Sequence, residues 1–141
     1  MRMKLEEMFT VHVKIEKTIV LDSIDADSVV MISFTGHVTG EYFQGEVLEG
    51  GVDTQVISKS GDRHNLSARY MLQGKDYTGE VCQIYIENNG DAHKKWKDAL
   101  FRTYPKIITN SKALSFLNED LFVGEGLPTE LGVDIKIYRW V

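Results

Sequence analysis

The sequence predicts an all-β fold, a closed or nearly closed antiparallel barrel of about eight strands with little helix. Short β-branched and aromatic segments recur along the chain, and several alternate between apolar and polar positions. Twelve glycines separate these segments, whereas prolines occur at two positions. A barrel or a sandwich would suit this pattern. We favour the barrel because closure removes the exposed strand edges that invite aggregation.

The first third of the chain is predicted to form two strands joined by a polar loop. Phe9–Glu16 alternates between apolar and polar residues, as in a half-buried strand. Asp22–Ser28 is rich in Asp and Ser, which favour turns. Alternation then resumes over Val29–Tyr42, where Gly36 and Gly40 indicate bends or bulges.

A three-stranded meander is predicted in the middle of the chain. Its strands are Val52–Lys59, Leu66–Gln73 and Glu80–Asn88, separated by the turn sequences Ser60–Arg63 and Gly74–Gly79. Even-numbered positions are assigned to the core side: Val52, Val56, Leu66, Ala68, Tyr70, Leu72, Cys82, Ile84 and Ile86. Odd-numbered positions form a polar face: Asp53, Gln55, Ser67, Arg69, Gln83, Tyr85 and Glu87. This face is continuous if odd positions pair with odd ones.

The last third is predicted to contain short elements and a closing strand. Ala92–Leu100 could form one or two helical turns, and Lys112–Asn118 a further turn. Lys106–Thr109 and Leu121–Gly124 resemble short strands, and Val133–Val141 closes the chain as a longer one.

Length and charge indicate one domain, residues 1–141, that does not bind nucleic acid. A chain of 141 residues suits a single core. Lys and Arg number 16 against 21 Asp and Glu, which gives a net charge of −5 and a pI near 5.3. A binder of phosphate backbones is usually basic.

Cysteine, histidine and the N-terminal sequence indicate a cytoplasmic protein without a metal or other cofactor. The single cysteine, Cys82, cannot form an internal disulfide. Acidic residues near the N-terminus argue against a signal peptide, and no apolar run has the roughly 20 residues of a membrane helix. The four histidines lack the local spacing of a zinc site.

The polar face of the meander provides the candidate site. One interpretation is that this face meets solvent, which is ordinary for an antiparallel sheet. The other is that Asp53, Gln55, Arg69 and Tyr85 line a barrel lumen, where Arg69 would bind a carboxylate or carbonyl oxygen. Gln55 and Tyr85 would orient the ligand, while Asp53 would pair with Arg69 or accept a proton.

Two residues of the preceding long strand could join the same wall. His37 and Glu41 lie on its polar side. His37 is, with Asp53, a candidate acid or base, and Glu41 is a further candidate for ligand binding.

Five segments resemble, in order, the motif blocks of a bacterial and fungal family, domain of unknown function 3237, also called uncharacterised protein family 0311. They are Val47–Gln55, Leu66–Leu72, Ile84–Gly90, Phe101–Pro105, and Phe116–Asn118 with Val123–Gly126. The resemblance covers roughly residues 29–141 and implies a small antiparallel, calycin-like or up-and-down barrel with a polar-lined interior. It therefore favours the lumen interpretation, and it implies no activity.

This chain departs from the family pattern at positions that matter for chemistry. Thr54 stands where an aromatic is common, and Ser67 where an aspartate is usual. The segment before Phe101 is also short. Without an acid at position 67, Asp53 is the main candidate for proton transfer.

Three functions are compatible with these observations. The first is a barrel that binds a small anionic or carbonyl-bearing metabolite, anchored by Arg69. The second is a cofactor-free lyase or isomerase in which Asp53 or His37 moves a proton and Arg69 stabilises an oxyanion. The third is a structural or protein-interaction module, which a lumen packed solid would favour. Self-association as a homo-oligomer is compatible with all three.

Overall fold

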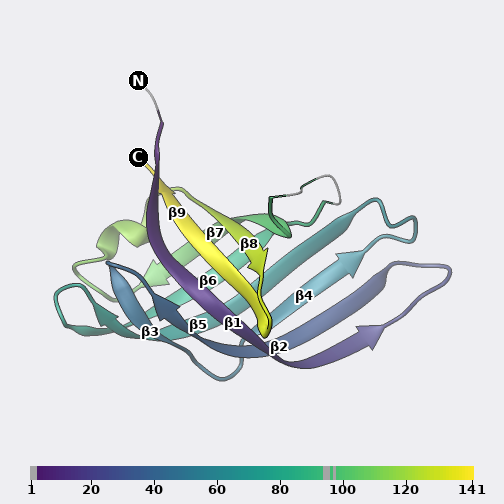
Figure 1. Ribbon diagram of the computed structural model, residues 1–141, viewed down its shortest axis with the longest axis horizontal. Helices are drawn as coiled ribbons and strands as arrows, with labels where there is room; N and C mark the ends of the chain where they lie inside the picture. The colour runs from purple at the N-terminus through teal and green to yellow at the C-terminus, as the bar shows by residue number, and fades with distance from the viewer. Residues whose placement is uncertain (1–2, 94–95, 97) are drawn as a thin grey trace.

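In the computed structural model, which describes residues 3–93, 96 and 98–141, the chain forms an antiparallel β-barrel (Figure 1). The strands of this described part are β1 (Leu5–Leu21), β2 (Ser28–Thr39), β3 (Phe43–Val47), β4 (Val52–Ile57), β5 (His64–Asp76), β6 (Val81–Asp91), β7 (Phe101–Thr109), β8 (Phe122–Pro128) and β9 (Gly132–Trp140). A 3₁₀ helix, η1 (Ser115–Asn118), lies between β7 and β8.

The barrel is closed because β1 pairs with both β9 and β2. From β9 the order runs β8, β7, β6 and β5, and β5 then pairs with both β3 and β4, which in turn pair with β2. The result is an eight-stranded barrel with an extra strand, as the sequence predicts. The first and last strands, β1 and β9, lie side by side (Figure 1), and Lys4 and Val141 exchange backbone hydrogen bonds of 2.9 Å.

Strands β3 and β4 share one position in the barrel, between β2 and β5. Val29–Tyr42 was expected to be one strand, but β2 ends at Thr39 and the chain turns before β3 begins at Phe43. Strands β3 and β5 pair antiparallel, and their backbones approach closely where Gly45 lies opposite Gly74. A Cβ atom at either glycine would collide with the backbone of the opposite strand. Glycine is required there by the close approach of the two backbones.

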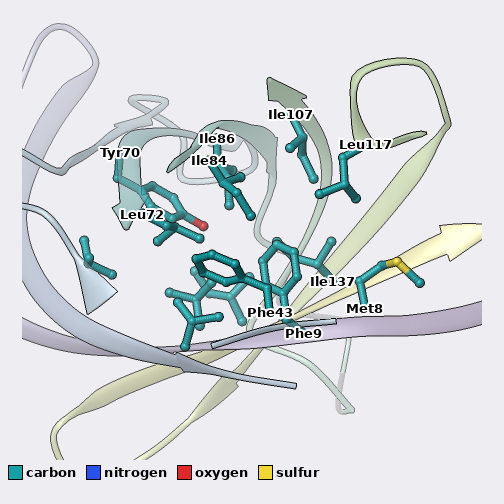
Figure 2. Close-up of a cluster of buried hydrophobic side chains, with 14 of the residues drawn as sticks. Met8, Phe9, Phe43, Tyr70, Leu72, Ile84, Ile86, Ile107, Leu117 and Ile137 are labelled. Carbon is teal, nitrogen blue, oxygen red and sulfur yellow. The ribbon is translucent and has the colours of Figure 1, made fainter. Parts of the chain in front are cut away.

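One half of the barrel is packed with large apolar side chains. Phe9, Phe43, Leu72, Ile84 and Ile137 are 0–1% exposed and point toward one another (Figure 2). The segment around η1 adds two further members of this core, Leu114 and Leu117. Residues from β1, β3, β5, β6 and β9 thus stabilise the fold together.

The predicted faces of β5 and β6 are confirmed, but the predicted register of β4 is wrong. Asp53 pairs with Ala68 and Gln55 with Leu66, so odd positions of β4 lie opposite even positions of β5. Arg69 pairs with Glu87, which keeps odd positions together between β5 and β6. Val52 and Val56 therefore lie on the outer side of the barrel, as Arg69 does. Their predicted place in the core was wrong.

The helical predictions have different outcomes. Lys112–Asn118 contains the turn η1. The described residues of Ala92–Leu100 are not helical, and residues 94, 95 and 97 of this prediction lie outside the described residues. Within the described ranges, no helix is long and apolar enough to span a membrane.

We predict that the packed half carries much of the stability. Phe43→Ala should lower the free energy of unfolding by about 3–5 kcal/mol, because it removes a buried ring and leaves a cavity. Chemical denaturation measures this value. Tyr104→Ala is the control: Tyr104 is 71% exposed, and its loss should change the free energy by about 0.5 kcal/mol or less. Equal effects of both substitutions would contradict this assignment of the core.

Candidate functional site

The other half of the barrel encloses a cavity of about 280 Å³, here called the lumen cavity. Strands β1, β2, β4, β5, β6, β7 and β9 contribute to its wall, together with Ala92 and Leu100, which lie between β6 and β7. The wall is mainly apolar: Val13, Ile15, Ile32, Phe34, Leu66, Ala68, Ala92, Leu100, Phe101, Val133 and Ile135. A concave, mostly apolar space with a few polar groups is typical of a small-molecule site.

Four polar side chains interrupt this apolar wall on one side. Asp53 and Gln55 come from β4, His64 from the start of β5, and Asn88 from β6. The register of β4 is responsible, since it turns the odd positions of this strand toward the interior.

Asp53, Ala68 and Asn88 form a row across three adjacent strands. Asp53 pairs with Ala68, and Ala68 pairs with Asn88. Two strand spacings of about 4.7–4.9 Å separate the backbones of Asp53 and Asn88 by roughly 10 Å. Ala68 carries a single methyl group, and all three residues line the lumen cavity.

A hydrogen-bonded chain orients the Asp53 carboxyl group. His64 Nε2 lies 2.6 Å from Gln55 Oε1, and Gln55 Nε2 donates to Asp53 Oδ2 at 2.7 Å. Since an amide oxygen accepts, His64 carries its proton on Nε2. The other carboxyl oxygen, Asp53 Oδ1, is buried and has no hydrogen-bond partner among the described residues.

Asn88 is the second polar group with unused hydrogen-bonding capacity. Its side chain is fully buried, and neither its Oδ1 nor its Nδ2 has a partner in the part of the chain that the structure describes. Leaving a buried amide unpaired costs about 1–3 kcal/mol. Because Asn88 lines the cavity, a molecule inside the cavity can supply the missing hydrogen bonds.

Burial changes the ionisation of two groups on this side of the barrel. Burial raises the pKa of Asp53, while the hydrogen bond from Gln55 and the nearby His64 act in the opposite direction. Burial also raises the pKa of Tyr70, and the Asp53 carboxylate contributes to that shift. Tyr70 therefore keeps its phenolic proton at neutral pH.

The lumen cavity borders a second hollow on the outside of the barrel. His64, Ala92 and Leu100 line both the cavity and a neighbouring outer hollow. Leu100 is 48% exposed, and His64 and Ala92 are half-buried. These three residues define the mouth through which a ligand would enter.

The structure separates the predicted site residues into two groups. Asp53 and Gln55 line the lumen cavity, as expected. Placing Arg69 and Tyr85 in the lumen was wrong, because both are odd-numbered residues of β5 and β6, whose even positions point inward. The predicted Asp53–Arg69 pair therefore does not form across the lumen.

Arg69 and Tyr85 belong instead to an outer ladder of polar side chains. Arg69 is 67% exposed and lies 3.9 Å from Glu87, and the Tyr85 hydroxyl donates to the same carboxylate at 3.4 Å. The solvent-facing interpretation is thus correct for β5 and β6.

His37 and Glu41 also lie away from the lumen cavity. Both are exposed. The His37 ring stacks on His12 with ring centroids 4.6 Å apart, and His12 Nδ1 lies 2.9 Å from Asp134. The proposed contribution of His37 and Glu41 to the same wall was therefore wrong.

Sequence reasoning missed His64 and Asn88. Asn88 follows the apolar even-numbered residues Cys82, Ile84 and Ile86 on one face of β6, so an amide at that position was a usable signal. His64 lay before the predicted start of the strand at Leu66, and alternation gave no indication of its direction.

Comparison with known proteins places this barrel in a family. The sequence matches the family described as "Protein of unknown function (DUF3237)" over residues 3–140. The chain belongs to this family. The resemblance noted from the five sequence segments is therefore confirmed, and it extends over nearly the whole chain.

Relatives of the DUF3237 chain include both sequences and solved structures. The UPF0311 protein CA_C3321 of Clostridium acetobutylicum is 31% identical, covering 99% of this chain and 80% of the relative. A crystal structure of a protein with unknown function from C. acetobutylicum has a TM-score of 0.84 at 29% identity, covering 100% and 99% of the two chains. The crystal structure of an enzyme from Penicillium herquei has a TM-score of 0.75 at 16% identity, covering 99% and 95%, and shares the fold.

We predict that Arg69 is dispensable for the lumen cavity. Arg69→Ala should change the free energy of unfolding by less than about 1 kcal/mol, because its ion pair with Glu87 is exposed. Ligand binding in the lumen should be unchanged, since the side chain lies outside the barrel. Denaturation and a ligand titration measure both quantities, and a loss of ligand affinity would contradict the placement of Arg69.

A second prediction follows from the buried carboxyl group. With its folded-state pKa raised above the unfolded value, Asp53 favours folding fully below the unfolded pKa, and this contribution is lost as pH rises through the folded pKa. Asp53→Asn should therefore raise Tm relative to wild type more at pH 7 than at about pH 3, below the ordinary Asp pKa. Thermal unfolding at both pH values measures the difference in Tm between Asp53→Asn and wild type. A difference that does not change with pH would contradict a carboxylate destabilised by burial.

Proposed function

We propose that this protein binds a compact, uncharged, mainly apolar molecule that carries a carbonyl or hydroxyl oxygen, in the lumen cavity. The observation that carries the proposal is the pair of polar groups, Asp53 and Asn88, that face a mainly apolar cavity with hydrogen-bonding capacity unused by the described residues. A ligand hydroxyl between them would satisfy both, and a ligand carbonyl would accept from the Asn88 amide.

Size and surroundings support a compact apolar body. The cavity volume of about 280 Å³ is near the lower limit of ordinary ligand sites. Phe34 and Phe101 supply aromatic surface, and the aliphatic residues Ile32, Leu66 and Ile135 complete the wall. Burying a ring or branched aliphatic group there would contribute about 25 cal/mol for each Å² removed from water.

The charges around the cavity support an uncharged ligand. Of the described residues that line it, none is Lys or Arg, and Asp53 is acidic. An anion would meet this carboxyl group in a space where burial already disfavours charge. The anionic alternative depended on Arg69, which lies on the outer surface. A carbonyl-bearing ligand needs a hydrogen-bond donor, and Asn88 Nδ2 provides one at the cavity wall.

The polar side of the cavity supports an oxygen-bearing ligand. Asn88 Nδ2 offers N–H donors to a carbonyl or hydroxyl oxygen, and Asn88 Oδ1 can accept from a hydroxyl group. Asp53 Oδ1 can accept from a hydroxyl or, when protonated, donate to a carbonyl. Ala68 lies between them in the same row and also lines the cavity, so one ligand can reach both side chains.

Two further observations bear on the choice between binding and other functions. A structural module was expected to have a solidly packed lumen, whereas this lumen contains a cavity of about 280 Å³. The Penicillium herquei protein of the same fold is called an enzyme, which is compatible with a barrel of this kind acting on its ligand.

A ligand series tests the proposal. 2-Indanone is a compact bicyclic ketone, indane lacks its oxygen, and indane-2-carboxylate adds a negative charge. We expect 2-indanone to bind wild type more tightly than either analogue, as measured by NMR titration. Asn88→Leu should weaken 2-indanone binding about tenfold or more, because it removes the amide donor.

A matched substitution on the same strand provides the control. Asn89→Leu makes the same change one residue further, at an exposed outer position, and should leave binding unchanged. Asn88→Leu should also raise the free energy of unfolding by about 1 kcal/mol or more, because it removes an unpaired buried amide, so loss of folding is distinguishable from loss of binding. Absence of 2-indanone binding, preference for the carboxylate, or equal affinities of wild type and Asn88→Leu would contradict the proposal.

A further inference from the structure

We propose that Asp53 is a proton-transferring catalytic residue: its Oδ1, which accepts no hydrogen bond from the described residues, removes a proton from the carbon next to a ligand carbonyl, while Asn88 Nδ2 donates to the carbonyl oxygen. The protein would thus enolise, and thereby isomerise, a compact ketone without a cofactor. This inference rests on the proposed function, because the ketone must first bind in the lumen cavity.

The orientation of Asp53 leaves one defined oxygen available for proton transfer. Oδ2 is held by the amide of Gln55 at 2.7 Å, and this amide is itself fixed by His64 Nε2 at 2.6 Å. The hydrogen-bonded chain therefore assigns the two carboxyl oxygens different roles. Oδ2 is occupied by the protein, and Oδ1 is the oxygen that gains or loses a proton toward the ligand.

Asn88 lies where it can stabilise the negative charge that develops on the ligand. It is two strands from Asp53 in the same inward-facing row, with Ala68 between them. A donor fixed in a buried site before reaction stabilises a developing oxyanion far better than water would. In this arrangement, the carbonyl oxygen is directed toward Asn88 and the adjacent carbon toward Asp53.

The reaction balances with these groups alone. The Asp53 carboxylate forms an O–H bond with a proton from the carbon next to the carbonyl. The electron pair of the broken C–H bond becomes a carbon–carbon double bond, and the carbonyl π pair moves to oxygen. Asp53 then returns the proton to the same carbon, which restores the ketone, or to the far end of a conjugated enolate, which moves a double bond.

The surroundings of Asp53 suit this role. Burial raises the pKa of the carboxyl group, which makes its ionised form a stronger base. Apolar residues around the cavity limit competing water. The other candidate acid or base, His37, is exposed outside the barrel and cannot reach a ligand in the lumen.

Hydrogen exchange tests the proposal with the same probe as binding. The methylene protons of 2-indanone lie between a carbonyl and an aromatic ring and are readily enolised. In D₂O near neutral pH, substoichiometric wild-type protein should accelerate their replacement by deuterium above the buffer rate, as followed by proton NMR. Asp53→Asn should reduce the protein-dependent rate about 10²–10⁴-fold, the usual contribution of a positioned base, and should still bind 2-indanone.

The controls separate this inference from the proposed function. Asp25→Asn removes an exposed carboxylate in the loop between β1 and β2 and should exchange at the wild-type rate. If 2-indanone binds wild type but exchanges no faster than in buffer, or if Asp53→Asn exchanges as fast as wild type, the catalytic role is overturned and binding stands. If 2-indanone does not bind wild type, both proposals are overturned.

Discussion

The site depends on one pairing, that of Asp53 with Ala68 between β4 and β5. Side chains alternate between the two faces of a strand, so this pairing sends both Asp53 and Gln55 into the barrel. A shift of one residue would place them outside and bring Val52 and Val56 inward. The lumen would then lose its carboxyl group and keep His64 and Asn88 as polar lining residues, and the outer ladder around Arg69 and Glu87 would gain an acid.

The barrel divides stability and recognition between its two halves. The half around Phe9, Phe43 and Leu72 is packed with buried apolar side chains. The other half contains a cavity and a fully buried amide, Asn88, whose unused hydrogen-bonding capacity opposes stability. Functional sites commonly carry such local costs, and the packed half offsets them.

The sequence predicted the faces of β5 and β6 but not the register of β4, and the connections explain the difference. Residues Ser58–Arg63 join β4 to β5, an even number of residues, so odd positions pair with even ones. Five residues, from 76 to 80, lie between the paired Lys75 and Val81, which preserves parity between β5 and β6. Alternation along a strand reveals its two faces, but it does not give the length of a turn.

The same limit explains why the candidate site was only partly predictable. Asp53 and Gln55 were identified as polar residues on one strand face, and the family resemblance favoured a polar lumen. Arg69 was placed beside them through the assumed register, and it lies outside. His64 belongs to the site because its side chain hydrogen-bonds to Gln55 on the neighbouring strand. Periodicity within one strand does not predict a contact between two strands.

The central claim is that a ligand carbonyl lies in the lumen cavity with its oxygen at Asn88 and its neighbouring carbon at Asp53, and a crystal structure of the protein with 2-indanone tests it most directly. The account predicts the ketone in the lumen cavity, with its oxygen within hydrogen-bond distance of Asn88 Nδ2 and a methylene carbon facing Asp53 Oδ1. A ketone bound elsewhere, or an Asn88 amide paired with protein groups in a collapsed lumen, would contradict it.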